Sequence, residues 1–292
     1  MRYVMEHLAT PDRFAFGENW SRFARLLDES RIAEAESSLS SMVGVDDLEG
    51  RSFLDVGSGS GLFSLAAARL GAGRIHSFDY DADSVACTAA VRERFFYDKE
   101  DWYVERGDIT DEAYCAGLGT FDVVYSWGVL HHTGVLWRAL ENTCGLVSPG
   151  GLLFVSIYND QGRRSIRWRK IKRRYNNLHP SLRTPYAVFV STPRELSTAA
   201  RRLVRGRMRA YLRSWSEPGP RGMSRWHDLL DWAGGYPFEV AKPEEIFRFC
   251  RDRGFELREL VTAGGGLACN EFVFARTTEG QLCFCRRLLQ VG

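Results

Sequence analysis

The sequence has no apolar run long enough to form a membrane-spanning helix. Its longest runs, such as residues 151–157, fall far short of the roughly 20 apolar residues that such a helix needs. The amino-terminal stretch, MRYVMEHLATPDRF, carries charges and lacks the apolar core of a secretory signal. With 45% hydrophobic and 26% charged residues, this 292-residue chain has the composition of a soluble protein, and we expect it in the cytoplasm.

Paired cysteines are also missing. The seven cysteines are an odd number, and none of them has the Cys-x-x-Cys spacing of a zinc site. We therefore expect buried free thiols and predict no metal site. Cys283 and Cys285 are the one pair whose spacing could support redox or metal chemistry.

Acidic residues are scarce in one long segment. Residues 161–225 contain 18 lysines and arginines but only two acidic residues, Glu195 and Glu217. This segment therefore carries +16 and the rest of the chain −14, although the net charge is only +2. Such segregation indicates either an anionic partner near the segment or complementation by the acidic remainder of the chain.

Short apolar strands alternate with helices along most of the chain. Strand patterns occur at residues 52–56, 74–78, 102–105, 121–125, 152–158, 256–262 and 269–276. Helical patterns occur at residues 16–46, 62–70, 84–96, 137–146, 163–176, 194–214 and 243–253. The alternation predicts a Rossmann-like, doubly wound α/β fold whose seven-stranded sheet is mostly parallel, with an antiparallel last strand. We divide the chain into an N-terminal helical cap (1–49), a core (50–159 and 241–292) and an inserted basic helical lid (160–240).

A glycine loop follows the first strand, in LDVGSGSGLF. Gly57, Gly59 and Gly61 form the pattern G-x-G-x-G, whereas a dinucleotide fingerprint is G-x-G-x-x-G and would place a glycine at position 62. A P-loop would have a lysine directly after Gly61, but Leu62 stands there. The loop is therefore a poor match to both of these phosphate-binding motifs.

Acidic residues follow the next two strands. Asp79, in FDYD, lies 24 residues after Asp55, where a carboxylate can accept hydrogen bonds from both hydroxyls of a ribose. Asp108, in GDIT beside the apolar Ile109, is placed to accept from an adenine amino group. Because the carboxyl ends of parallel strands meet at one edge of a sheet, these residues and the strand ending YSWGVLHH should line one crevice.

These motifs, in order, resemble those of the class I S-adenosylmethionine-dependent methyltransferases over residues 50–158 and 240–276. The series is LDVGSGSG, FDYD, GDIT, FDVVYSWGVLHH and LVSPGGLLFVSIYN, followed by ELRELVTAGGGLACNEFVF. The resemblance implies S-adenosylmethionine as cofactor. The residues it implies for binding are Gly57, Ser58, Gly59 and Gly61 at the methionine part, with Asp55 beneath them, Asp79 at the ribose, Tyr80, Asp108 and Ile109 at the adenine, and Ser126 and Trp127 near the methionyl end. The upstream RFAFGENWSRF is similar to the helix that covers the cofactor in many members, which adds Asn19 and Trp20.

Methyl transfer from a sulfonium needs alignment and a dry site, and it needs a base only when the acceptor arrives protonated. His131 and His132, after the fourth strand, are the first candidates for that base, and we expect His132 to be the structural one of the two. His227, beside Asp228 near the end of the lid, is a further candidate. The candidates for substrate contact are Tyr158, Asn159, Arg163 and Arg167.

Three interpretations of the basic lid stay open. Its arginines could clamp a small anionic substrate, follow an RNA backbone while aromatic side chains stack on bases, or form a solvated face that balances the acidic core. The fourth strand lacks the Asn/Asp-Pro-Pro-aromatic run of methyltransferases that act on flipped bases, so we favour a small molecule over nucleic acid.

We therefore predict an enzyme that methylates an oxygen or nitrogen atom of a small, anionic metabolite, in the manner of natural-product or sugar tailoring. The alternatives are an RNA or protein methyltransferase that uses the basic lid, and a non-catalytic protein that binds S-adenosylmethionine. No oligomeric state is predicted.

Overall fold

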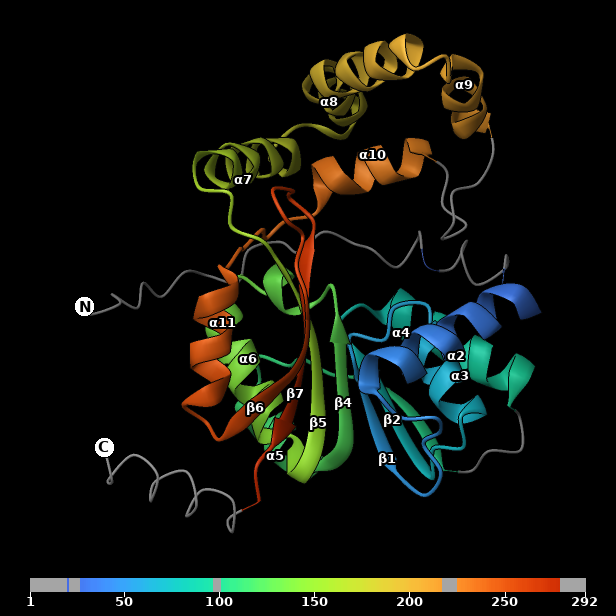
Figure 1. Ribbon diagram of the computed structural model, residues 1–292, viewed down its shortest axis with the longest axis vertical. Helices are drawn as coiled ribbons and strands as arrows, with labels where there is room; N and C mark the ends of the chain where they lie inside the picture. The colour runs from blue at the N-terminus through green and yellow to red at the C-terminus, as the bar shows by residue number, and fades with distance from the viewer. Residues whose placement is uncertain (1–19, 21–26, 97–100, 217–224, 279–292) are drawn as a thin grey trace.

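One sheet, with β1 and β4 as neighbours at its centre, organises the structure (Figure 1). The computed structural model describes Trp20 and residues 27–96, 101–216 and 225–278. Its seven strands lie in the order β3-β2-β1-β4-β5-β7-β6, and β7 is antiparallel to both of its neighbours while the other pairs are parallel. The bounds are β1 Ser52–Val56, β2 Arg74–Asp79, β3 Trp102–Arg106, β4 Phe121–Trp127, β5 Val147–Tyr158, β6 Phe255–Val261 and β7 Cys269–Arg276. The predicted fold class is confirmed.

Helices cover both faces of this sheet (Figure 1). On one face lie α2 Glu29–Val43, α3 Leu62–Arg69 and α4 Ala82–Phe95, and on the other lie α5 Glu112–Leu118, α6 Leu136–Gly145 and α11 Pro243–Arg251. Neighbouring strand residues point to opposite faces. Phe53 therefore packs in the cluster beneath α2 and α3, while Leu54 packs in the cluster beneath α6 and α11. The central strands are apolar along their whole length because both of their faces are buried.

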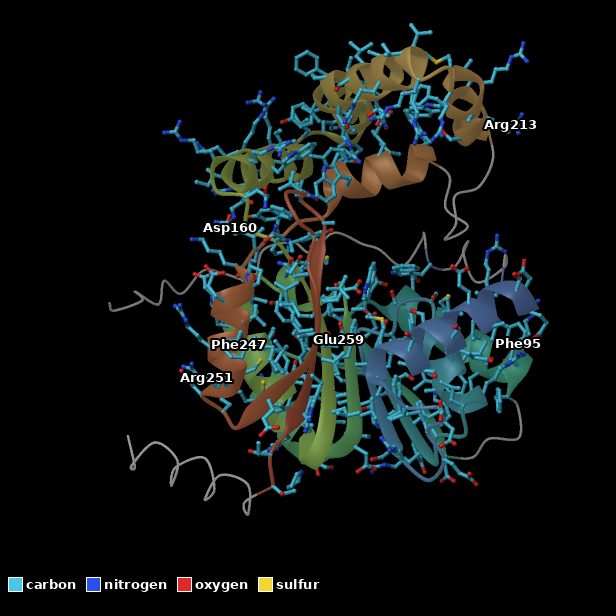
Figure 2. All side chains as sticks on the ribbon, viewed as in Figure 1. Phe95, Asp160, Arg213, Phe247, Arg251 and Glu259 are labelled. Atoms are coloured by element: carbon cyan, nitrogen blue, oxygen red, sulfur yellow. The ribbon has the colours of Figure 1, made fainter. Side chains whose placement is uncertain are left out.

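A separate layer of helices lies above the carboxyl edge of the sheet (Figure 1). It comprises α7 Arg163–Asn176, α8 Pro180–Val204, α9 Met208–Ser216 and α10 Arg225–Gly234. The chain enters this layer directly after β5, near Asp160 (Figure 2). It returns through residues 235–242 to α11. The layer has its own small core, in which Tyr175, Ala187 and Ala233 are buried.

Several element boundaries differ from the prediction. The predicted helix at 194–214 is two helices, because α8 already begins at Pro180 and the chain turns at Gly206, whose φ is +65°. Pro185 and Pro193 both lie inside α8, although proline lacks the N–H that the interior of a helix uses. The predicted helix at 16–46 is interrupted: Trp20 is helical, residues 27 and 28 are not, and α2 begins at Glu29, where Asp28 caps the backbone N–H of Arg31.

Two further differences lie in the core. Helix α5, which we did not predict, begins after Asp111, whose carboxylate accepts from the N–H groups of Ala113 and Tyr114. Strand β5 begins at Val147 instead of residue 152, because Val147 pairs with Phe121 before a register shift in the ladder. The Pro-Gly-Gly that follows Ser148 suggested a turn in the sequence but is accommodated in the irregular start of this strand.

Candidate active site

The glycine loop lies at the carboxyl end of β1 and is tied to the end of β2. The backbone N–H groups of Gly57 and Ser58 both donate to the carbonyl of Phe78, at 2.9 and 3.0 Å. Gly57, Gly59 and Gly61 have φ angles of +77°, +54° and +76°, a region that side-chain-bearing residues rarely adopt. A Cβ on Gly57 would lie 2.4 Å from the side chain of Val129. The alternate glycines are therefore required by backbone conformation and by close packing.

Asp55 lies beneath this loop and is buried. Its Oδ2 accepts a 2.5 Å hydrogen bond from Ser64 Oγ, which is 2.8 Å from Ser77 Oγ, and Ser77 in turn accepts from Trp102 Nε1 at 2.9 Å. Burial, partly offset by Ser64, raises the pKa of Asp55 from 3.8 to about 7. Asp55 thus supports the loop through a buried polar chain and does not face the crevice. Ser58, also buried, bonds Thr88 of α4 instead.

Asp79 joins the end of β2 to the middle of the loop. Its Oδ2 accepts from the N–H of Gly59 at 3.0 Å and its Oδ1 from the N–H of Asp81 at 2.9 Å. Burial raises the pKa of Asp79 from 3.8 to about 6, although these two bonds favour the carboxylate. Each carboxylate oxygen can accept a second hydrogen bond, so the pair suits the two vicinal hydroxyls of a ribose.

The remaining residues predicted for the adenine lie at the ends of β2 and β3. Tyr80 is exposed, and the guanidinium of Arg106 lies 5.5 Å from its ring centroid. Asp108 Oδ1 accepts from both the N–H and the hydroxyl of Thr110, which shapes the turn after β3. Ile109 is buried in the core under α6, so it can support an adenine edge but presents little surface to it.

Three aromatic or hydroxyl residues complete the predicted cofactor set. Ser126 is buried, and its hydroxyl donates to the Val56 carbonyl at 3.4 Å, between β4 and β1. Trp127 Nε1 donates to Glu271 Oε1 on β7 at 3.0 Å. The half-buried Trp20 covers Gly59, since a Cβ there would be 3.1 Å from the indole. Asn19 lies outside the described residues.

This arrangement fits the cofactor that the resemblance implies. The loop offers closely approachable backbone at Gly57, Gly59 and Gly61, and Asp79 offers paired acceptors beside it. Trp20 lies against the same loop. The crevice is at the β1/β4 boundary, the position where open α/β sheets bind ligands. Among the described side chains, no cluster of three or more histidines, cysteines and carboxylates could hold a metal ion.

The two histidines after β4 have different surroundings. They form the 3-10 helix η1, Leu130–His132. His131 is fully buried and neither of its ring nitrogens makes a well-formed hydrogen bond. Burial, with the neighbouring His132 and the charge of Lys172, holds its pKa well below the usual value. His131 is thus the more deeply buried of the two, and the roles expected for both histidines stay predictions.

His132 is only half-buried, and its tautomer can be read from its hydrogen bond. Its Nδ1 lies 2.7 Å from the carbonyl of Pro237, which can only accept, so Nδ1 carries the hydrogen. Burial and the nearby charge of Lys172 lower the pKa of His132 to about 3, so the ring is neutral at pH 7. The lone pair is therefore on Nε2.

Tyr158, at the end of β5, is the centre of an aromatic cluster that joins the core to the helical layer. Its ring centroid is 4.0 Å from that of His131 and 5.6 Å from that of His132. On the other side it lies 5.8 Å from Trp232 of α10 and 5.1 Å from Phe238. The predicted substrate residue Tyr158 therefore lies beside both histidines.

Lys172 of α7 is fully buried above this cluster. Its Nζ lies 4.3 Å from the ring centroid of Trp232 and 4.9 Å from that of Phe238, and it donates to the carbonyl of Trp232. Buried ammonium groups are rare unless paired or placed over aromatic rings. The positive charge of Lys172 is thus held at the site by two aromatic faces and a carbonyl.

The segment after α10 anchors the helical layer to the histidine turn. The N–H of Glu239 donates to the carbonyl of His131 at 3.0 Å, and Glu239 Oε2 accepts from the N–H of Leu136 at the start of α6 at 3.0 Å. Burial raises the pKa of Glu239 from 4.5 to about 7, although its backbone hydrogen bonds oppose the shift. Arg169 donates to the carbonyl of Phe238 at 3.0 Å. These bonds hold α7 and residues 237–239 over η1.

The other predicted substrate residues lie elsewhere. Asn159 is buried and donates to the carbonyls of Gly264 and Gly266, while its Oδ1 accepts from Asn270. It therefore secures the β6–β7 loop. The side chain of His227 in α10 lies outside the described residues, so its predicted role stays a prediction.

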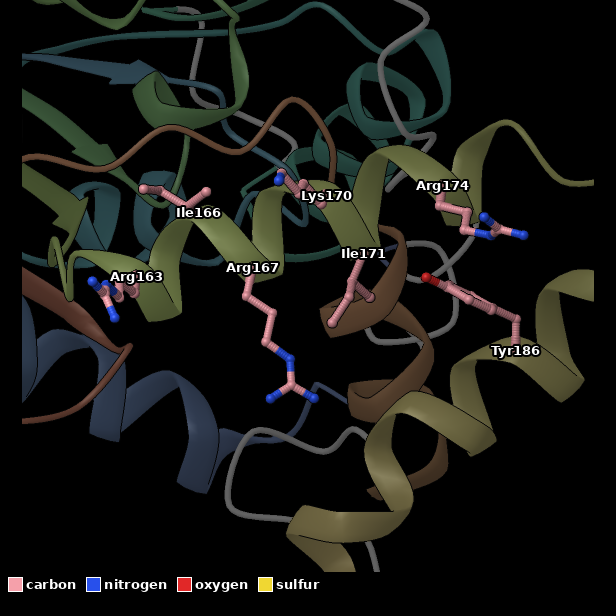
Figure 3. Close-up of a pocket in the computed structure, with 7 residues that line it drawn as sticks. All are labelled: Arg163, Ile166, Arg167, Lys170, Ile171, Arg174 and Tyr186. Carbon is pink, nitrogen blue, oxygen red and sulfur yellow. The ribbon is translucent and has the colours of Figure 1, made fainter.

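Arg163 and Arg167 are exposed on the face of α7 opposite to Lys172. With Ile166, Lys170, Ile171, Arg174 and Tyr186 of α8 they line a hollow of about 400 Å³ between α7 and α8 (Figure 3). Ser165 and Lys172 occupy the inward face of the same helix. We therefore leave both arginines out of the site beside the histidines.

Sequence reasoning missed Lys172, Trp232, Phe238 and Glu239. Lys172 looked like one more basic residue of KIKRRY. Its spacing from Ser165, Trp168 and Tyr175 does place it on the least basic face of α7, and this was the available signal. The role of Phe238 depends on contacts with Tyr158 and Lys172, and that of Glu239 on a contact with η1, so neither had a local signal.

Comparisons with known proteins agree with this geometry. A family model described as a methyltransferase domain matches residues 22–259. A ubiquinone biosynthesis O-methyltransferase of Parvibaculum lavamentivorans is 33% identical over 107 residues, which cover 37% of this chain and 40% of that protein. The protein of the same name from Brucella melitensis is 34% identical over 112 residues, covering 38% and 43%. The chain thus spans less than half the length of these curated relatives.

Solved structures share the fold at low identity. An O-methyltransferase family protein from Burkholderia thailandensis has a TM-score of 0.52 and 14% identity, covering 90% of this chain and 59% of that one. The [4+2]-cyclase SpnF has a TM-score of 0.50 and 13% identity, covering 83% and 80%. At such identities these likenesses concern the fold alone.

Proposed function

Because this chain belongs to the class I S-adenosylmethionine-dependent methyltransferases and uses that cofactor, we propose that it methylates an oxygen or nitrogen atom of a small, anionic metabolite in the cytoplasm. One observation carries the proposal. A neutral histidine and a buried ammonium meet at the aromatic wall formed by Tyr158, on the turn after β4 whose Val129 lies against Gly57 of the glycine loop.

The cofactor supplies an electrophilic methyl group on a positively charged sulfur. The glycine loop and Asp79 would hold it, and the rings of Trp20 and Trp127 lie at the loop and at the end of β4, where they would help to exclude water. Alignment of the acceptor with the methyl group supplies most of the acceleration in such a displacement. The aromatic wall of Tyr158, Trp232 and Phe238 offers apolar surface for an acceptor ring or chain.

His132 would receive the proton that the acceptor loses. Its Nε2 carries the lone pair, because Nδ1 donates to Pro237. A group with a pKa of about 3 is a weak base toward a neutral hydroxyl, but it is basic enough for an oxygen acceptor that has become an oxonium on bonding to the methyl carbon. A methylated amine would keep its proton as an ammonium and needs no such base. His132 therefore orients the acceptor first and takes its proton late in the reaction, and water then removes that proton.

Lys172 accounts for the preference for an anion. The only charge that the described residues hold fully buried in this cluster is positive, and it lowers the pKa of both histidines. A carboxylate or phosphate on the acceptor would be attracted by that charge across a low-dielectric wall. The partial match to ubiquinone biosynthesis O-methyltransferases supports an oxygen acceptor.

The test is a turnover assay with matched acceptors. Purified protein is incubated with S-adenosylmethionine and a panel of hydroxylated or amino carboxylates, each paired with its neutral methyl ester, and S-adenosylhomocysteine is measured. We expect turnover with an acid and a several-fold lower kcat/KM with its ester. The Asp79→Ala variant, assayed at a cofactor concentration near the native Kd, serves as the control with reduced turnover. Methylation of total RNA or protein with no small acceptor used would contradict the proposal.

A further inference from the structure

Helix α8 turns its large apolar side chains outward. Ala187 and Ser191 are its buried residues, and they face the small core formed with α7 and α10. In contrast, four large apolar side chains are 53%, 76%, 65% and 62% exposed, namely Leu182, Phe189, Leu196 and Leu203. We call these four residues the α8 stripe. A stable soluble helix normally buries such residues and exposes the small ones, so the stripe needs an explanation.

The stripe is continuous along the helix. Its members are seven residues apart, and a helix drifts by only about 20° per seven residues, so they lie on one side over a length of about 30 Å. Helix α8 is in the layer furthest from the sheet (Figure 1). Among the described elements its main contacts are with α7, α9 and α10, and Ala187 packs in the core that they share.

The segment that carries the stripe is strongly positive. Residues 180–216 contain eight arginines and a single acidic residue, Glu195, whose carboxylate accepts from Tyr211. Within the described residues, the arginines of α8 pair with no carboxylate; Arg183 donates to the carbonyls of Leu178 and Asn176, and Arg201 to that of Ser197. Arg213 of α9 lies at the outer end of the same layer (Figure 2).

The basic hollow between α7 and α8 opens beside the stripe. Tyr186, which lines it, is four residues after Leu182 and three before Phe189, so all three lie on neighbouring parts of the helix surface. Figure 3 shows Tyr186 of α8 reaching toward Arg174 of α7. The hollow thus places guanidinium and ammonium groups next to exposed apolar side chains, with room for a phosphate.

We propose that α8 and the adjoining basic hollow dock this enzyme on the surface of a bilayer that contains anionic lipids. An amphipathic helix with an apolar stripe and flanking arginines lies in the plane of the membrane interface, where its apolar side enters the acyl boundary. The arginines attract anionic headgroups, and the hollow receives a lipid phosphate. Among the residues that the structure describes, no helix has the length and hydropathy of a membrane span, so the contact is peripheral.

The chemistry of the surface favours a bilayer over two other partners, a second copy of this chain and RNA. A second copy of this chain would bring two strongly positive faces together, which costs electrostatic energy. RNA would be bound through stacking on aromatic rings, whereas three of the four stripe residues are leucines. Docking would place the helical layer, and the site beneath it, at the membrane interface.

The experiment is vesicle co-sedimentation of the full chain, without cofactor or acceptor. Vesicles of phosphatidylcholine alone are compared with an equal mixture of phosphatidylcholine and phosphatidylglycerol. We expect binding only to the mixture, weakened by added salt. Because no turnover is measured, this result can fail while the proposed methyl transfer stands, and the reverse also holds.

Paired variants test the surface. Phe189→Ser with Leu196→Ser should weaken binding at least about tenfold, and Arg201→Gln with Arg202→Gln should remove the preference for phosphatidylglycerol. The matched control is Tyr103→Ser with Val261→Ser, which removes two exposed apolar side chains from β3 and β6 and should bind like the native protein. Circular dichroism and unfolding midpoints confirm that each variant is folded.

Three results would overturn the proposal. One is native protein that stays in the supernatant with both vesicles at low salt. Another concerns the Phe189→Ser, Leu196→Ser variant. The proposal fails if this variant binds single-stranded RNA as tightly as native protein does and also binds vesicles as well as native protein does. The third is a native dimer in sedimentation velocity that this variant converts to a monomer, which would assign the stripe to self-association.

Discussion

His132 Nδ1 donates a 2.7 Å hydrogen bond to the carbonyl of Pro237, a residue 105 positions further along the chain. This bond joins the turn after β4 to the segment that leaves the helical layer, and it decides which nitrogen of the imidazole holds the lone pair. Core and helical layer would thus form the proposed acceptor side of the site together.

Replacing His132 should slow the chemical step. We expect His132→Gln to lower kcat by roughly 10²- to 10⁴-fold, the usual contribution of a proton-accepting side chain, while the cofactor Kd stays unchanged. Steady-state kinetics and calorimetry separate the two effects. The control is His179→Asn, which changes an exposed histidine that caps α8 and keeps a capping side chain. A fully active His132→Gln enzyme would remove His132 from the mechanism.

Replacing Asp79 should weaken cofactor binding. Asp79→Ala removes a carboxylate that can accept charge-assisted hydrogen bonds from a ribose, and we expect the cofactor Kd to rise roughly ten- to hundredfold, equivalent to about 1.5–3 kcal/mol. Titration calorimetry measures it. Asp81→Ser, which removes a charge two residues away and keeps the cap of α4, is the matched control. Equal affinity in native and Asp79→Ala protein would refute the ribose assignment.

Cofactor affinity should also depend on pH through Asp79. Its pKa of about 6 means that the carboxylate gains a proton as the pH falls from 7 to 5, and a protonated carboxyl loses acceptor capacity. We expect the Kd to increase as the pH falls through 6 and to level off above 7. The Kd of Asp79→Ala should show no such step, and a step of the same size in that variant would assign the titration to another group.

Asp55 should make the protein less stable at high pH. Its pKa is raised from 3.8 to about 7 in the folded state, so its contribution to the free energy of unfolding is full below pH 4 and is lost as the pH rises through 7. Asp55→Asn keeps an oxygen acceptor for Ser64 and removes the buried charge. We expect the variant to be more stable than native protein at pH 8, by at most about 4 kcal/mol, and to lose this advantage near pH 4.

The matched control for Asp55→Asn is Asp122→Asn, whose effect on stability has the opposite sign. Hydrogen bonds from Ser52 lower the pKa of Asp122, so Asp122→Asn should destabilise the protein at neutral pH, and this loss should shrink as the pH falls below 4. Urea unfolding at several pH values measures both differences. Parallel curves for Asp55→Asn and native protein between pH 5 and 8 would show that the Asp55 carboxyl does not titrate there.

Lys172 should act on His132 through its charge. Lys172→Met keeps a long side chain in the aromatic cage and removes the ammonium, so the pKa of His132 should rise, and KM should increase more for an anionic acceptor than for its neutral ester. Stability should change little, since replacing a buried charge by an apolar side chain of similar size is often tolerated. Nuclear magnetic resonance titration of His132 gives the pKa. Lys170→Met, on the opposite face of α7, should leave it unchanged.

Short-range sequence patterns were enough to predict most of the strands and helices of the core. The strands and the cofactor loop could be predicted because their requirements are short-range: doubly buried strands are apolar throughout, and Gly57, Gly59 and Gly61 need positive φ angles. Asp79 could be placed because it lies at a strand end, and all parallel strands end at the same edge. The helices of the layer above the sheet were harder to predict from the sequence. Pro185 and Pro193 suggest breaks, yet α8 runs through both because Ala187 and Ser191 pack against α7 and α10.

The sequence by itself determined the fold class, the position of the cofactor crevice and the segregation of positive charge into one segment. These depend on side-chain periodicity, on glycines with positive φ angles and on the count of charges. All three follow from the order of residues along the chain. The tertiary structure decided that His131 is buried and His132 carries its lone pair on Nε2, that Lys172 alone among the arginines and lysines of α7 is buried, and that α8 leaves its stripe uncovered. Each of these depends on a partner far away in the sequence, and burial or a distant carbonyl sets the chemistry of a side chain only after the chain has folded.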